Sequence, residues 1–501
     1  MNRPRTAAHR RQSEAALILT LGLAAMVVSM MQTLVVPILG LIQHELHTTS
    51  ANVSWVTTAT LLSAAVFTPL LGRLGDQHGK RPTLLGVLVL MVVGSVVAAT
   101  TDSLTWLIIA RVLQGAATAI FPLALSVLRE QLRPERLPGA MALVSGTLAF
   151  GSGLALVATG LLTRGPDAGY HQVFWLATGL AVVALVAVAL VVPATGHRTG
   201  GRIDVLGALS LAGLLVLVLL PLSQGHEWGW SSARTLLCFG GAGVMAVVWV
   251  LIERTVADPL VDLRMFTHRP VLLTNVAGLF VGFAMFTLFV GVSYLVQMPS
   301  RLAGYGFDAS VLRASVEFLL PATLLSLVAS QFGGVLVRRV GARVTLVLSA
   351  AAGAAGFAWL TADHASAAAV IGAGALVGAG ISFGYAAMPA LIMASVPHHQ
   401  SGIANGINSI SRSVGSSIGS AAVTTLLASK SVAHLPAGVP ALPAESQFTI
   451  SFVLAGVAFG LVVIVALVGL RGGPAPRSTV EAGSEAEATP QVREAPVGAP
   501  A

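Results

Sequence analysis

The ten residues GRLGDQHGKR, from Gly72 to Arg81, have a counterpart in GVLVRRVGAR, from Gly334 to Arg343. The two segments align in register at an offset of 262 residues and share a glycine, a leucine, a charged residue, a second glycine and an arginine at matching positions. Each segment follows the second apolar run of a series. Because a repeated junction at the same place in two series indicates a duplicated unit, we predict a chain built from two related halves.

The composition around these segments is that of a chain embedded in lipid. Only 10% of the 501 residues are charged, 55% are hydrophobic and the mean hydropathy is +0.85, whereas an average soluble domain has about 25% charged residues. Crossing a bilayer takes roughly 20 apolar residues in a helix. Fourteen such runs occur, at 17–40, 53–72, 83–100, 104–128, 139–162, 172–193, 205–223, 235–252, 272–297, 311–337, 344–361, 366–394, 403–428 and 448–470. We therefore predict an all-α, polytopic membrane protein with 14 transmembrane helices.

The basic residues orient these spans. Loops on one side hold 21 of the 28 lysines and arginines, and loops on the other side hold five. Such a bias marks cytoplasmic loops, so we expect both termini in the cytoplasm and the chain in a plasma membrane, that of a bacterium. The net charge of +8 comes from basic residues in the loops and does not indicate a nucleic-acid partner. Because Cys238 is the single cysteine, an internal disulfide is excluded.

The repeat offset is two helices longer than a plain six-plus-six duplication requires, and the runs at 205–223 and 235–252 account for the excess. Parallel repeats are typical of transporters, in which the substrate path lies between the halves. We expect a basic N-terminal arm, a six-helix bundle, a linker with two extra helices, a second six-helix bundle and a disordered cytoplasmic tail, at 1–16, 17–193, 194–270, 271–470 and 471–501.

The segment from Gly72 to Arg81 resembles the loop motif of the major facilitator superfamily, and RVLQG at 111–115 resembles its fourth-helix signature. The two extra helices are similar to those of the fourteen-helix drug:proton antiporter branch, as are the segments 201–207, 258–266 and 402–419. The resemblance implies two rocking bundles, alternating access, and export of drugs, antibiotics or amphipathic metabolites driven by protons. It also implies a conformational switch formed by Gly72, Asp76, Gly79, Lys80 and Arg81.

Asp76 lies at a helix end near basic residues, among which we expect Lys80, Arg81 and Arg136. A carboxylate there can interact with a helix dipole and a basic neighbour, and so latch the two halves in one state. The alternative is a solvated loop charge that only helps to set the topology.

Arg111 lies within its span, where a charge costs about 2.5–3.5 kcal/mol on insertion scales and needs a partner. Gln114 lies one turn away on the same face. Both belong either to the proton or substrate path or to a structural site in which backbone carbonyls satisfy the arginine.

Further polar residues in late spans are candidates for the same path. Asn405, Asn408 and Arg412 are spaced i, i+3 and i+7 and share one stripe. This stripe faces either the cavity or another helix, to which it would hydrogen-bond. Glu317, four residues before Pro321, is a candidate proton carrier if it is buried, and otherwise lies at the wet interface.

An apolar cavity with few polar groups suits amphipathic organic molecules. Candidate lining residues are Met30, Gln32, Phe150, Phe286, Tyr294, Phe383 and Tyr385. The alternative for each aromatic residue is packing between helices or contact with lipid.

Two positions depart from the drug:proton antiporter pattern. Gln32 stands in the first span, where this branch commonly has an acid, and the fifth-helix motif at 151–160 has Ala155-Leu156 in place of Gly-Pro. These differences leave a facilitator or importer of another small solute as the alternative function. We expect no enzyme, because Gly75–Lys80 lacks the spacing of a phosphate-binding loop and the histidines lie in loops or at helix ends. The expected partners are an amphipathic compound, protons and membrane lipid. We expect no nucleotide, cofactor or metal, and we expect the protein to function as a monomer.

Overall fold

The structure is a computed structural model. It describes residues 7–48, 50–163, 169–194, 204–256, 259, 263, 268–396, 400–432 and 442–469. The expected tail at 471–501 and most of the segment 258–266 lie outside the described residues.

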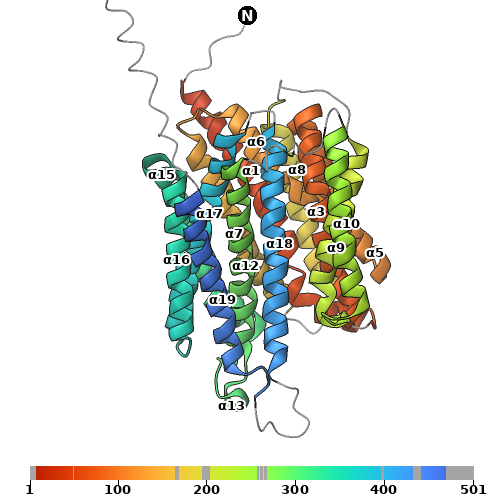
Figure 1. Ribbon diagram of the computed structural model, residues 1–501, viewed down its shortest axis with the longest axis vertical. Coiled ribbons are helices and arrows are strands. Elements are labelled where there is room, and N and C mark those ends of the chain that lie inside the picture. The colour runs from red at the N-terminus through yellow and green to blue at the C-terminus, as the bar shows by residue number, and fades with distance from the viewer. Residues whose placement is uncertain are drawn as a thin grey trace, which may run out of the picture. The chain divides into compact units, whose positions relative to one another are not determined.

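The described residues form a bundle of long helices (Figure 1). In the first part these are α1 (Ala7–Thr33), η1 (Val36–Ile38), α2 (Leu39–Glu45), α3 (Ser50–His78), α4 (Lys80–Thr100), α5 (Leu104–Ala116), η2 (Ala117–Ala119), α6 (Ile120–Gln131), α7 (Leu137–Leu162), α8 (Tyr170–Val191), α9 (Val205–Trp228) and α10 (Ala233–Thr255). Then follow α12 (Arg269–Gln297), α13 (Ser300–Ala303), α14 (Val311–Arg313), η3 (Ala314–Leu319), α15 (Leu320–Val340), α16 (Ala342–Ala362), α17 (Ala367–Ser395), α18 (Ser401–Ser429), α19 (Glu445–Ile464) and η5 (Val465–Gly469).

Thirteen spans in the described part of the chain are long and apolar enough to cross a membrane. The helix α18 is equally long, with 29 residues, but carries more serine, asparagine and arginine. With α18 added, the helices agree with the predicted 14, and the predicted all-α fold is confirmed.

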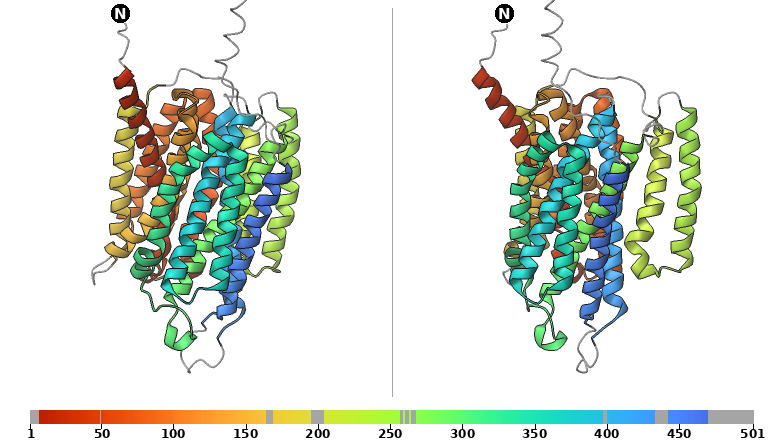
Figure 2. Two further views of the ribbon diagram at one scale, coloured as in Figure 1. Left: turned by 90° about the vertical axis from the view of Figure 1, so that its left-hand side faces the viewer. Right: turned by 60° about the vertical axis from the view of Figure 1, so that its left-hand side comes forward.

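The buried apolar side chains form two main cores. One extends from Leu17 to Val192 and, apart from Met393, lies within α1–α8, and the other extends from Ala277 to Ala466 within α12–η5. We refer to these groups of helices as the N-terminal and C-terminal halves. The pair α9 and α10 stands at one edge of the bundle (Figure 2, right).

The repeated segments occupy equivalent junctions. Gly79, between α3 and α4, has a φ of 110°, and Gly341, between α15 and α16, has a φ of 87°. This backbone region strongly favours glycine, so a single residue reverses the chain at each place. The segment from Gly72 to His78, expected as a loop, is instead the last two turns of α3. We call the end of the bundle that contains Gly79 and Gly341 the basic end.

We expect Gly79→Ala to lower the free energy of unfolding by about 1–2 kcal/mol, because a side chain disfavours positive φ. The measurement is denaturant unfolding in detergent. Gly86→Ala is the control, since the added Cβ meets no atom within 4 Å in the α4 helix. Equal stability of the two variants would contradict the prediction.

The two halves contact each other along a stripe of glycines on α7. Gly139, Gly146, Gly153 and Gly160 recur every seven residues. A Cβ at Gly153 or Gly146 would overlap Thr323 or Ser330 of α15, and one at Gly334 would lie 2.7 Å from the Cα of Gly139. The stripe therefore brings the helix backbones together without interlocking side chains.

The pair α9 and α10 contacts both halves through α9 and the residues that follow it. The helix α9 packs against α3 and α18. Gln224 of α9 donates a hydrogen bond to the Thr58 hydroxyl of α3 (3.1 Å), and the Trp230 indole that follows α9 donates to the Thr425 hydroxyl of α18 (3.2 Å). The pair thus bridges the seam between α3 and α18.

Proline explains the main differences from the predicted spans. The helix α1 ends at Thr33 rather than at 40, because Pro37 cannot donate the hydrogen bond that would continue the helix. Pro122 likewise follows the short 3-10 segment η2 that interrupts the fourth span. The helix α1 also begins at Ala7, inside the segment expected as an arm.

Candidate transport path and interbundle latch

Asp76 links the two halves at the basic end. Its Oδ2 accepts hydrogen bonds from the backbone N–H groups of Gly402 (3.1 Å) and Ile403 (3.4 Å), in the first turn of α18. Asp76 is 3% exposed. The first N–H groups of a helix lack internal partners and carry partial positive charge, so this carboxylate stabilises the end of a helix from the other half.

Glycine makes this contact possible. A Cβ at Gly402 would lie 2.7–2.9 Å from the atoms of the Asp76 carboxylate, and one at Gly72 would lie 3.2 Å from the Gly402 carbonyl oxygen. The sequence identified Gly72 and Asp76 but not their partner, which lies 326 residues away. We call the contact of Asp76 with Gly402 and Ile403 the latch.

The basic residues near Asp76 are distributed differently from the expectation. Lys80 lies 3.7 Å from Asp76 and also forms an ion pair with Glu130. Arg81 donates to the Ala189 carbonyl at the end of α8 (2.8 Å). Arg136, expected near Asp76, instead forms an ion pair with Glu14 (2.6 Å). Lys80 is therefore the nearest of the three expected basic neighbours.

A second contact between the halves lies at the same end. Arg129 of α6 donates to the carbonyls of Met393 (2.6 Å) and Val396 (3.2 Å), at the end of α17. A cation at a helix C-terminus complements the carboxylate at the N-terminus of α18. Sequence reasoning counted Arg129 only as a loop charge, and its sequence neighbourhood gives no signal for this role.

The repeated segment of the C-terminal half makes a different contact. Arg338, at the position that corresponds to Asp76, is exposed and donates to the Glu135 carbonyl just before α7 (3.4 Å). Of the two repeats, only the first therefore places a carboxylate on a helix N-terminus of the opposite half.

Arg111 is 1% exposed and lies wholly within the N-terminal half. Its guanidinium donates to the carbonyls of Val56 (3.1 Å) and Met31 (3.0 Å) and to the Gln114 side chain (2.5 Å). Met31 lies in the last turn of α1, where carbonyls have no helical partner. Gln114 donates in turn to Ser95 (3.0 Å). Arg111 and Gln114 thus join α1, α3, α4 and α5.

Arg412 lies where the halves meet. Its guanidinium stands over the Phe121 ring of α6, 5.2 Å from the centroid, and over the Tyr385 ring of α17, at 4.9 Å. It donates to Asn408 (2.6 Å) and Ser409 (3.2 Å) on its own helix.

Asn408 and Asn405 are also buried, on the side of α18 that carries Arg412. Asn408 donates to Asn275 of α12 (3.2 Å), and Asn405 donates to the Ser401 carbonyl (2.9 Å). The stripe predicted from spacing thus faces other helices and, at Arg412, the seam between the halves.

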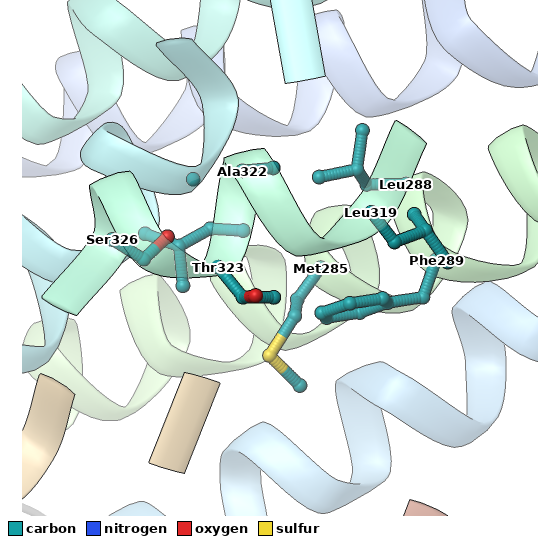
Figure 3. Close-up of a pocket in the computed structure, with 9 residues that line it drawn as sticks. Met285, Leu288, Phe289, Leu319, Ala322, Thr323 and Ser326 are labelled. Atoms are coloured by element: carbon teal, nitrogen blue, oxygen red, sulfur yellow. The ribbon is translucent and has the colours of Figure 1, made fainter. Parts of the chain in front are cut away.

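A small cavity of about 10 Å³, room for about one water molecule, lies between α12, η3, α15 and α17 (Figure 3). Met285 and Phe289 point into it together with Thr323. The Tyr385 hydroxyl donates to the Met285 sulfur (3.1 Å), so this cavity adjoins the Arg412 site. Sequence reasoning named Tyr385 but missed Phe121 and Met285.

The other expected lining residues are dispersed. Met30 is buried, and Gln32 donates to Thr118 (3.2 Å). Tyr294 is 48% exposed. The remaining aromatic candidates are partly buried, namely Phe150, Phe286 and Phe383.

Glu317 lacks the burial on which its expected role depended. Its side chain is 38% exposed and forms an ion pair with Arg313 (2.6 Å). The hydrogen bond from Arg313 to Glu317, and then the charge of Glu317, raise the pKa of Arg313.

Comparison with known proteins identifies the family. The sequence profile of the Major Facilitator Superfamily matches residues 21–420 and 314–497. The chain is 29% identical to the tetracenomycin C resistance and export protein of Streptomyces glaucescens, over 82% of this chain and 76% of that protein. It is 28% identical to the cephamycin export protein CmcT of Amycolatopsis lactamdurans, over 85% and 86%. The proton:xylose symporter XylE has the same fold, with a TM-score of 0.63 at 13% identity, covering 91% of this chain and 95% of that one. The chain belongs to the major facilitator superfamily and is a multi-pass secondary transporter.

Proposed function

We propose that this transporter exports amphipathic organic compounds, such as drugs, antibiotics or metabolites, by alternating access. The observation that carries the proposal is the latch, because Asp76 can bind the α18 N-terminus only while the basic end is closed. Two relatives that are named for the export of tetracenomycin C and of cephamycin support the direction and the class of substrate.

The distribution of charge supports a location in the plasma membrane with both termini in the cytoplasm. The basic end then faces the cytoplasm, as the positive-inside rule requires. Closing the latch would separate the substrate path from the cytoplasm, and opening it would admit substrate. The transporter works as a monomer, since both halves of the path belong to one chain.

We propose proton antiport as the driving force, in line with the branch that the sequence resembles. A facilitator is the second candidate, and two observations favour it. Gln32, which cannot carry a proton, takes the place of an acid in α1, and Glu317 is exposed and paired with Arg313.

The test is efflux from a pump-deficient bacterial host that expresses the full chain. Cells are loaded with tetracycline, norfloxacin, ethidium or fusidic acid, and retention is followed with and without a protonophore. We expect net efflux of at least one compound and its collapse on uncoupling, whereas a facilitator would only equilibrate the compound. Asp76→Asn should reduce efflux, and Asp363→Asn, an exposed acid elsewhere, should not. Retention equal to that of empty-vector cells for every compound would overturn the proposal.

A further inference from the structure

A buried positive charge lies at mid-depth between the two halves. Arg412 is the twelfth of the 29 residues of α18, about 16 Å along a helix that rises 1.5 Å per residue. Phe121 and Tyr385, which flank its guanidinium, each lie ten residues before the end of their helix, at Gln131 and Ser395. The three side chains therefore meet near the middle of the membrane, and Phe121 alone comes from the N-terminal half.

This charge has no anionic partner in the part of the chain that the structure describes. The hydrogen-bond acceptors of Arg412 are the neutral oxygens of Asn408, Ser409 and Tyr385. The ion pairs among described residues do not include Arg412. These three bonds use at most three of the five N–H donors of a guanidinium. An arginine cannot escape the cost of burial by losing its proton, so the site is one negative charge short of neutrality.

Arg111 and Arg412 differ in what their guanidinium groups contact. Arg111 is also buried, but its donors reach two backbone carbonyls on other helices and the side-chain amide of Gln114. Arg412 hydrogen-bonds to two neutral side chains of its own helix and to the Tyr385 hydroxyl, and its guanidinium stands over two aromatic rings. Arg111 therefore has a structural explanation that Arg412 lacks.

Arg412 lies close to the apolar wall of the small cavity, to which Tyr385 connects it. The Tyr385 ring contacts the guanidinium, and its hydroxyl contacts the Met285 sulfur, which lines the small cavity. The cavity wall is otherwise formed mainly by apolar side chains, among them Leu288 and Phe289, of which Phe289 lies beside Met285 (Figure 3). One positive group beside an apolar, aromatic wall matches a molecule that has one acidic group on an apolar body.

We propose that the central site takes amphipathic organic anions. The carboxylate of such a compound pairs with Arg412 between Phe121 and Tyr385, and its apolar body packs against Met285, Leu288 and Phe289. This inference rests on the proposed export function and names its substrate class. Because Phe121 belongs to the other half, an anion that pairs with Arg412 competes with the contact between Arg412 and Phe121. The bound anion therefore touches side chains of both halves.

The test measures binding to the purified full chain in phosphatidylcholine nanodiscs. The probes are 1-pyrenebutyric acid, naproxen and fusidic acid, each compared with its primary amide, which keeps the body and removes the charge. We expect the wild type to bind at least one acid about tenfold or more tightly than its amide, as for a hydrogen bond between charged groups. Arg412→Gln should abolish this preference, and Arg412→Lys should keep part of it.

Two controls separate recognition from folding. Thermal unfolding shows whether Arg412→Gln is folded. If Arg412→Gln does not fold, Arg412→Lys, which keeps the charge, tests whether the preference for acids depends on residue 412. Arg111→Gln removes another buried arginine, one that holds helices of the N-terminal half together. Once thermal unfolding shows that this variant is folded, its ratio of acid to amide affinity should equal that of the wild type. Acids that bind no better than their amides, or a preference that persists in Arg412→Gln, would overturn the inference. Efflux of neutral or cationic compounds without any preference for acids would overturn this inference alone, whereas no efflux of any compound would overturn the proposed export function.

Discussion

Gly402→Leu is expected to lower the rate of export about 30-fold, because it removes about 2 kcal/mol from the state in which the basic end is closed. The new Cβ would fall within 2.7–2.9 Å of the Asp76 carboxylate atoms, so the side chain displaces the carboxylate from the α18 N-terminus. Export is measured in proteoliposomes with a compound identified in the efflux test. The variant is expected to insert and fold, since the position lies at a helix end.

Gly460→Leu and Asp76→Asn are the control variants for Gly402→Leu. Gly460→Leu on α19, where an added Cβ meets no atom within 4 Å, should export at the wild-type rate. Asp76→Asn should lose about as much activity as Gly402→Leu, and the double variant should lose little more, because both changes break one contact. Wild-type export by Gly402→Leu, or fully additive losses, would mean that the latch does not control transport.

Arg111→Ala is expected to lower the free energy of unfolding by about 3 kcal/mol, since it leaves several buried acceptors without donors. The carbonyls of Val56 and Met31 and the Gln114 side chain all lose their partner. Denaturant unfolding of the purified protein in detergent measures the change.

The control for this prediction is Arg301→Ala, which removes an exposed arginine and should change the free energy of unfolding by less than about 0.5 kcal/mol. Arg111→Lys, which keeps a donor, should fall between the two. If Arg111→Ala is as stable as the wild type while transport is lost, Arg111 acts in the transport path rather than in holding the helices together.

The helices could be predicted closely because length and hydropathy alone define a transmembrane span. Fourteen apolar runs correspond to the helices seen, with the clearest deviation at Pro37, where α1 stops early. The secondary structure of the segment Gly72–His78 is harder to predict, because its glycines and charges suggest a loop in water. In the structure, burial against α18 keeps this segment helical.

The site could be predicted only in part. Asp76 and Arg412 are conspicuous because charges are costly in or near a bilayer. Their partners are not conspicuous: Gly402 contributes a backbone N–H, which every residue other than proline has, and Phe121 is one of 18 phenylalanines in an apolar chain. Glu317 was misleading for the opposite reason, since its position near a helix end does not reveal whether it faces protein or solvent.

The depth of Arg412 also has a consequence for energetics. A fixed cation that shifts along the membrane normal as the bundles rock moves through part of the transmembrane voltage, which acts on a full elementary charge with about 2.3 kcal/mol per 100 mV. In the proposed cycle a monovalent anion at the site neutralises the charge of Arg412, and that charge is uncompensated when the anion is absent. The electrical potential of the cell would therefore act on Arg412 mainly in the return step, in which the anion is absent.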